Sequence, residues 1–213
     1  MRDVRVPTIV AAIAGVLLSE PVSANAAATQ LTVRTYDTFG VSQAAMDGAR
    51  RTAGSILTAA GIEIGWRDCH PIELLPRLST CDDPVGPLEV VVRIIAAGPK
   101  TRSGSLGNSW VDLQEKKGSL ATVHADRVES LASFARLEPG TLLGRTMAHE
   151  IGHLLLGSSV HAPRSLMRAC WSSKELQRNV AADWAFSRQE GALARRQLEA
   201  RAKPDEDKAV RSN

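Results

Sequence analysis

The sequence predicts an α+β domain with a mixed, mostly β sheet, an N-terminal helix and a second helix packed on that sheet, and a long C-terminal helix. Two observations predict this class. The 213 residues are 44% hydrophobic and 23% charged, which is an ordinary globular composition. Segments with strand and helix periodicity follow in the order β-α-β-β-β-β-α-loop-α, which favours one sheet with its helices on one side.

The first half of the domain is predicted to place one helix among three strands. Leu31 to Tyr36 alternates apolar and polar residues, the pattern of a half-buried strand. A helical pattern from Ser42 to Ala60 stops at Gly61, and a second strand pattern covers Ile62 to Trp66. The β-branched run from Leu88 to Ala96 predicts a central strand that is buried on both faces.

The second half is predicted to begin with two short rim strands, Trp110 to Leu113 and Ser119 to His124, joined by a polar turn. Ala125 to Leu137 fits either a helix or a helix-like loop. Thr141 to Leu156 predicts a helix that Gly157 closes, and its many apolar residues indicate burial.

The last predicted element is a long helix. It begins at Ser172, where Ser172-x-x-Glu175 has the pattern of a capping box, and it runs towards Arg201. The charged segment 203–213 is expected to be disordered. One domain is therefore expected over residues 27–202.

The N-terminal segment predicts export. Arg2 and Arg5 precede an apolar run from Val6 to Leu18, and the small residues at 23–26 fit a cleavage site. We therefore expect residues 1–26 to be a signal peptide. The run is shorter than the roughly 20 residues that cross a bilayer, so no stable membrane anchor is expected after cleavage. The protein is expected to be secreted, either to a periplasm or to the extracellular space.

The charge distribution argues against nucleic acid as a partner. The formal net charge is +3, yet acidic and basic residues alternate along the chain. No block of Lys and Arg interleaved with aromatic residues occurs. The mildly basic balance indicates a solvated surface, and the sequence indicates no oligomeric state.

The three cysteines all follow the predicted signal peptide, where an oxidising compartment permits a disulfide. Cys69 and Cys81 bracket a short proline-containing loop, and we predict that they form the disulfide. Cys170 lies in an apolar segment and is predicted to be a buried thiol.

The most informative segment is His149-Glu150-Ile151-Gly152-His153, an HExxH motif within the predicted helix. Two histidines four residues apart lie on the same helix face and can bind one Zn²⁺, and the glutamate between them can act as general base. Zn²⁺ with three protein ligands activates a water molecule and polarises a carbonyl group. Glu150 is therefore the candidate catalytic residue, with His149 and His153 as metal ligands.

The third metal ligand has two candidates. Gly157 allows the chain to turn back, and His161 follows four residues later, which makes it the preferred ligand. Glu175 on the following helix is the alternative, although the capping box explains this residue without a metal.

These residues resemble the metzincin superfamily of zincin metallopeptidases, in which HExxHxxGxxH is followed by a turn with a methionine beneath the metal. The resemblance rests on His149, Glu150, His153, Gly157, His161 and Met167. Here the two gaps around the glycine are each one residue longer than in the family pattern. The resemblance implies a zincin-like fold, Zn²⁺ as cofactor and Met167 as a structural residue below the site.

We therefore expect a secreted zinc metalloendopeptidase that cleaves polypeptides extended along a rim strand, at about residues 105–113. The alternative is a secreted zinc-binding protein without catalysis, in which the metal has a structural or protein-binding role. Glu150 argues against that alternative, because a purely structural zinc site does not require it.

Overall fold

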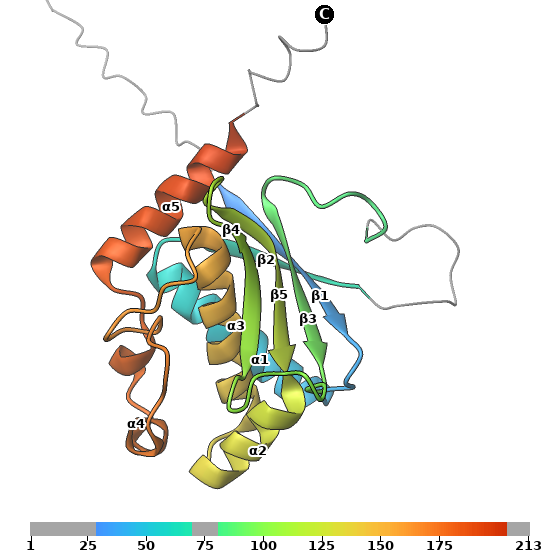
Figure 1. Ribbon diagram of the computed structural model, residues 1–213, viewed down its shortest axis with the longest axis vertical. Coiled ribbons are helices and arrows are strands. Elements are labelled where there is room, and N and C mark those ends of the chain that lie inside the picture. The colour runs from blue at the N-terminus through green and yellow to red at the C-terminus, as the bar shows by residue number, and fades with distance from the viewer. Residues whose placement is uncertain (1–28, 70–80, 204–213) are drawn as a thin grey trace, which may run out of the picture.

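The computed structural model describes residues 29–69 and 81–203. Its sheet has five strands: β1 (Gln30–Asp37), β2 (Glu63–Asp68), β3 (Glu89–Ile95), β4 (Gly107–Asp112) and β5 (Lys117–His124). The spatial order is β2-β1-β3-β5-β4 (Figure 1). Only β4 is antiparallel to its neighbour. The predicted mixed sheet is therefore confirmed, with β4 as its antiparallel edge strand.

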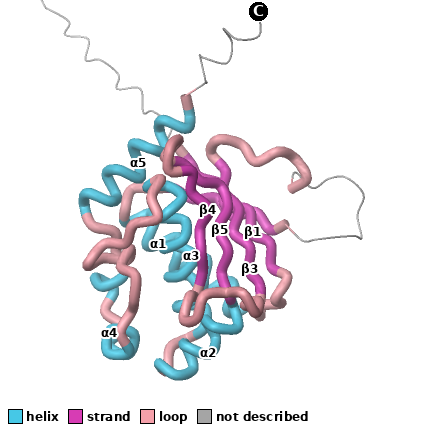
Figure 2. Tube along the Cα trace, in the orientation of Figure 1, coloured by secondary structure: helices cyan, strands magenta, loops and turns pink. Residues whose placement is uncertain are grey.

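The described helices are α1 (Gln43–Ala59), α2 (Ala125–Ala135), α3 (Pro139–Leu156), α4 (Ser173–Arg178) and α5 (Arg188–Ala202). Figure 2 shows the strands grouped on one side of the molecule and the helices on the other. In Figure 1, α3 runs beside β4, and α1 lies next to it against the sheet. The predicted segregation of helices to one side of the sheet is confirmed.

The core lies between the sheet and the helices. Alternate side chains of β1, β3 and β5 are fully buried on the helix side: Leu31, Val33, Val90, Val92, Ile94, Ala121 and Val123. Every residue of α3 from Leu142 to Leu155 is buried as well. The sheet, α1, α2 and α5 all contact this helix, so α3 is a central element rather than a surface helix.

The prediction that the third strand is buried on both faces is wrong. Its burial alternates, with Val90 and Val92 inside and Arg93 exposed. The physical reason is that α1 and α3 cover only one face of the sheet, so a β-branched run can occur where one face is packed.

The predicted long C-terminal helix is broken. α4 ends at Asn179, which has a φ of 51°, and a 3-10 turn over Ala181–Trp184 follows. Ser187 then begins α5 with a capping box. The break allows the chain to turn so that Trp184 becomes almost fully buried, with 2% of its surface exposed. Burial of a large aromatic side chain is a substantial favourable contribution to folding.

Smaller differences concern where elements begin. Ala125 to Leu137, for which a helix or a loop was expected, contains the helix α2. α3 begins at Pro139, two residues before the predicted start, because proline fits the first turn of a helix. β4 begins at Gly107, three residues before the predicted rim strand.

Cys69 and Cys81 form the predicted disulfide, with their Cα atoms 5.7 Å apart. Cys170 is exposed, so the prediction of a buried thiol is wrong. It lies in an irregular surface segment beside the exposed Ala169, where the apolar neighbours in sequence do not cover it. The predicted signal peptide and residues 204–213 lie outside the described residues. Within residues 29–69 and 81–203, no helix has the length and hydropathy of a membrane span.

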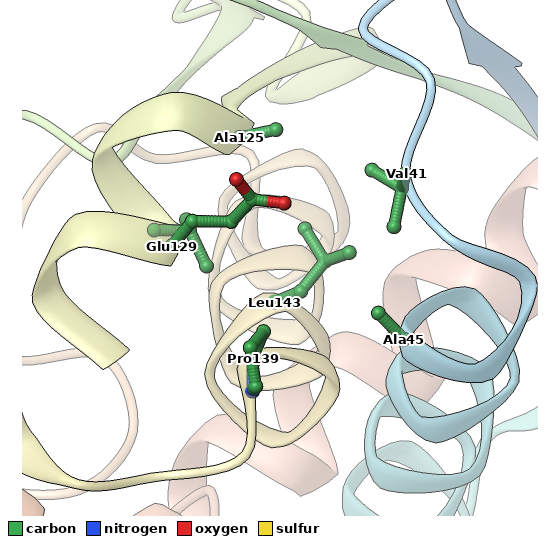
Figure 3. A pocket seen from close by; sticks show the side chains of 7 residues that line it. Val41, Ala45, Ala125, Glu129, Pro139 and Leu143 are labelled. Carbon is green, nitrogen blue, oxygen red and sulfur yellow. The ribbon is translucent and has the colours of Figure 1, made fainter. Parts of the chain in front are cut away.

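One small pocket lies between the N-terminal turns of α1, α2 and α3. Figure 3 shows Val41 and Ala45 facing Pro139 and Leu143 of α3, with Glu129 of α2 at one side. Its volume of about 10 Å³ has room for about one water molecule. Its lining is mostly apolar, as in a packing gap between helices.

Candidate metal centre

The helix α3 and the turn after it bring three histidines together. His149 and His153 lie one turn apart and are both buried, with 7% and 5% of their surfaces exposed. Gly157 ends the helix with a φ of 60°, and a Cβ there would lie 2.1 Å from the carbonyl oxygen of Lys116. Only glycine fits that position. The chain then turns back, and His161 joins the other two histidines at the solvent-exposed side of the cluster.

The ring nitrogens of the three histidines lie at distances that suit one metal ion. His149 Nε2 is 3.1 Å from His153 Nε2, which is 3.3 Å from His161 Nε2. Two nitrogens bound to one tetrahedral Zn²⁺ at about 2.0–2.1 Å would be about 3.3 Å apart. The candidate ligand atoms of all three residues lie within 4.8 Å of one another. This arrangement could hold a zinc ion.

The other ring nitrogens make hydrogen bonds that orient two of the imidazoles. His149 Nδ1 donates to the carbonyl oxygen of Leu166 at 2.9 Å, and His153 Nδ1 donates to that of Ser158 at 2.7 Å. A proton on Nδ1 leaves the lone pair of Nε2 free for a metal. Backbone carbonyls therefore fix the tautomer that metal binding requires.

Burial keeps the histidines neutral. It lowers the pKa of His149 to about 4, and the nearby charge of Arg168 acts in the same direction. Burial also lowers the pKa of His153 and that of His161. Neutral imidazole is the form that binds metal, so the three rings need not lose protons near neutral pH.

Glu150 follows His149 in α3, and its carboxylate reaches the edge strand β4. Its side chain is 5% exposed, and Ser109 Oγ donates a hydrogen bond to Glu150 Oε2 at 2.6 Å. Burial raises the pKa of Glu150 to about 7, and the bond from Ser109 acts against that rise. A carboxyl group with a pKa near the working pH can both accept and return a proton.

Met167 is buried and packs against α3 at Gly152, the residue before His153. A Cβ on Gly152 would be 2.6 Å from Met167 Sδ and 2.8 Å from the ring of Phe186. Glycine at this position therefore lets both side chains pack directly against α3. Trp171 packs the edge of its ring against His149, with the ring centres 5.8 Å apart.

Glu175 does not join the three histidines. Its carboxylate accepts hydrogen bonds from the backbone N–H and the hydroxyl of Ser172, which is the capping box. Its other oxygen lies 3.4 Å from Arg168 Nε. Of the two candidates, His161 is the one that lies with His149 and His153 in the cluster of potential ligands.

Sequence reasoning missed several residues that orient the site. Ser109 lies in the rim segment that the sequence singled out, but no motif marks its contact with Glu150. His149 and His153 donate hydrogen bonds to the backbone carbonyl oxygens of Leu166 and Ser158. Every residue type has such a carbonyl, so the sequence does not reveal these bonds. Trp171 also carries no motif, although an aromatic residue soon after Met167 was visible in the sequence.

The architecture of the described residues has a counterpart among solved structures. Among solved structures, the chain is similar to the crystal structure of archaemetzincin from Methanopyrus kandleri, with a TM-score of 0.54 and 16% sequence identity. The similarity covers 80% of this chain and 97% of that chain. No protein-family model matches the sequence, and no curated protein is similar to it at the level of sequence.

Proposed function

We propose that this protein is a secreted zinc metalloendopeptidase, with His149, His153 and His161 as metal ligands and Glu150 as general base. The observation that carries the proposal is the cluster of three histidine Nε2 atoms at 3.1 and 3.3 Å, two of them oriented by Nδ1 hydrogen bonds. Glu150 follows His149 directly in α3 and is not one of the clustered ligands, so its carboxylate remains available as a general base. The fold of archaemetzincin supports the same class.

In this proposal the metal, Glu150 and the edge strand β4 have separate roles. When bound, Zn²⁺ supplies a Lewis acid that polarises the scissile carbonyl and makes water acidic enough to react near pH 7. Glu150 accepts the proton of the attacking water and later donates it to the leaving amine. The exposed edge of β4 offers backbone groups to an extended polypeptide substrate.

Export is part of the proposal and rests on two features. The N-terminal segment has the layout of a signal peptide. The Cys69–Cys81 disulfide suits an oxidising compartment outside the cytosol.

Metal content is the first test. The purified parent is expected to bind one zinc per chain, and His161→Ala is expected to lower its zinc affinity by a factor of 10 or more, whereas Glu175→Ala leaves it unchanged. Zinc can be measured by elemental analysis and by competition with a chromogenic chelator. A parent that binds no zinc even after reconstitution would contradict the proposal.

Replacing Glu150 by Gln separates an enzyme from a zinc-binding protein. The variant is expected to keep its zinc and to lose hydrolysis of unfolded casein by about 10²- to 10⁴-fold, because general base catalysis is removed. If the parent and the variant both bind zinc but neither cleaves any protein, the result would favour the non-catalytic alternative.

A further inference from the structure

Glu150 depends on the edge strand for its orientation. Its carboxylate is buried, and within the described residues its hydrogen-bond donor is the hydroxyl of Ser109, 2.6 Å from Oε2. The same hydroxyl lies 2.9 Å from the main-chain oxygen of Glu150. A hydrogen bond to a charged acceptor is the stronger of the two, so the proton of Ser109 belongs with the carboxylate.

Gly107 provides the space for this arrangement. A Cβ at Gly107 would lie 2.7 Å from Glu150 Oε1 and 2.9 Å from Glu150 Cγ, closer than real Cβ atoms come. The glutamate side chain therefore passes directly over the backbone of β4. Gly107 and Ser109 are two residues apart in the strand and therefore face the same side of the sheet. One stretch of β4 thus provides both the space and the hydrogen bond.

The contact joins two elements that are distant in sequence. Ser109 lies on the edge strand, Glu150 lies on α3, and 41 residues separate them. α3 packs along β4 and β5, so the position of the edge strand determines where the carboxylate can lie. The hydroxyl of Ser109 uses one of the roughly four acceptor sites of the carboxylate, so other lone pairs remain to accept a proton from water.

We propose that Ser109 is a positioning residue that holds the carboxylate of Glu150 in the orientation required for proton transfer. The inference rests on the proposed function, because it assigns Ser109 a role in the same site. It follows that β4 would contribute to catalysis as well as to substrate binding. A substrate strand that shifts β4 would shift the general base with it.

The test uses Ser109→Thr and Ser109→Val as a matched pair, since they differ only in a hydroxyl and a methyl group. The zinc-loaded protein and both variants are titrated with a peptide hydroxamate. When a hydroxamate binds a zinc ion, it gives up an acidic proton, and a correctly placed general base accepts that proton. The valine variant is expected to bind about 10- to 100-fold more weakly than the threonine variant, the range seen when partners of a site's functional groups are removed. The threonine variant should bind like the parent.

The same pair in a Glu150→Gln background shows whether Ser109 acts through Glu150. If it does, the threonine and valine variants should bind the hydroxamate equally once the carboxylate is absent, because the two effects are not additive. Turnover of casein-derived peptides should give the same pattern, with kcat lowered and KM nearly unchanged for valine. Thermal unfolding of each variant, and Ser109→Ala as a smaller replacement, separate a loss of fold from a loss of orientation.

Three results are decisive. A threonine–valine difference that disappears in the Glu150→Gln background supports the role of Ser109. Equal hydroxamate affinity of the folded threonine and valine variants, in a parent that binds the hydroxamate, overturns this role and leaves the proposed function intact. A zinc-loaded parent that binds no hydroxamate and cleaves no peptide overturns both.

Discussion

At the scale of single residues, one buried ion pair is held by several hydrogen bonds that compensate for lost solvation. Arg34 and Glu89 form an ion pair on the sheet, with side chains only 3% and 16% exposed. Glu89 also accepts from Gly86 N–H and from Arg67, each within 2.9 Å. Arg34 in turn donates to the carbonyl oxygen of Asp83 at 2.7 Å, which ties the segment after the disulfide to β1.

This network predicts a stability that depends on pH. Burial alone would raise the pKa of Glu89, but the hydrogen bonds from Gly86 and Arg34 and the charges of Arg34 and Arg67 outweigh it and lower the pKa. A lowered pKa stabilises the folded state above the unfolded value of about 4.3, and this contribution is lost as the pH falls through the folded value. Glu89→Gln should therefore destabilise the protein by about 3 kcal/mol at pH 7.

Urea unfolding of the parent and Glu89→Gln between pH 7 and pH 3 measures this effect, with Glu63→Gln on an exposed strand position as the control. The difference between parent and Glu89→Gln should shrink below about pH 4. A difference that stays constant over the whole range would contradict the ion-pair explanation.

At the scale of elements, glycines allow α3 to approach its neighbours closely. A Cβ at Gly144 would lie 2.4 Å from the main-chain oxygen of Ala49 on α1. Glycine costs about 1 kcal/mol relative to alanine in a helix, so its presence indicates that contact between the helices is worth more.

Gly144→Ala and Gly54→Ala should therefore have opposite effects. Gly54 lies in α1, and a Cβ there would have no atom within 4 Å, so alanine at this position should stabilise the protein by up to about 1 kcal/mol. Alanine at Gly144 should destabilise it by about 1–3 kcal/mol, because α1 and α3 must move apart. Chemical unfolding measures both. Equal effects of the two substitutions would show that helix propensity, and not packing, governs position 144.

At the scale of the whole molecule, the disulfide joins the end of β2 to the segment that leads into β3. Both cysteines lie near β1, since Cys69 N–H donates to the carbonyl oxygen of Thr35 and Tyr36 donates to that of Cys81. The bond therefore fastens the sheet at the end opposite to β4 in the strand order.

Replacing both bridged cysteines by serine should cost about 3 kcal/mol, because the bond closes a short loop with a sequence separation of 12 residues. The thermal unfolding midpoint should fall accordingly, and reduction of the parent should lower it to a similar value. Cys170→Ser is the matched control and should change the free energy of unfolding by less than about 0.5 kcal/mol, since Cys170 is exposed. If the midpoint does not change when the bridge is removed, the disulfide does not stabilise the fold by lowering the conformational entropy of the unfolded chain.

The sequence by itself determined the local features of this protein. The period of its apolar residues predicted the strands β1 to β3 and the helices α1 and α3, because side-chain periodicity follows directly from backbone geometry. The spacing of His149 and His153 likewise predicted a shared helix face, and the short loop between Cys69 and Cys81 predicted the disulfide.

Only the tertiary structure decided how these pieces meet. It brought His161, and not Glu175, next to His149 and His153, because the positive φ of Gly157 turns the chain back to the helix. It broke the expected C-terminal helix to bury Trp184, and it brought Ser109 to Glu150 across 41 residues. These contacts depend on distances between elements, and a residue pattern that repeats every two to four positions contains no information about such distances.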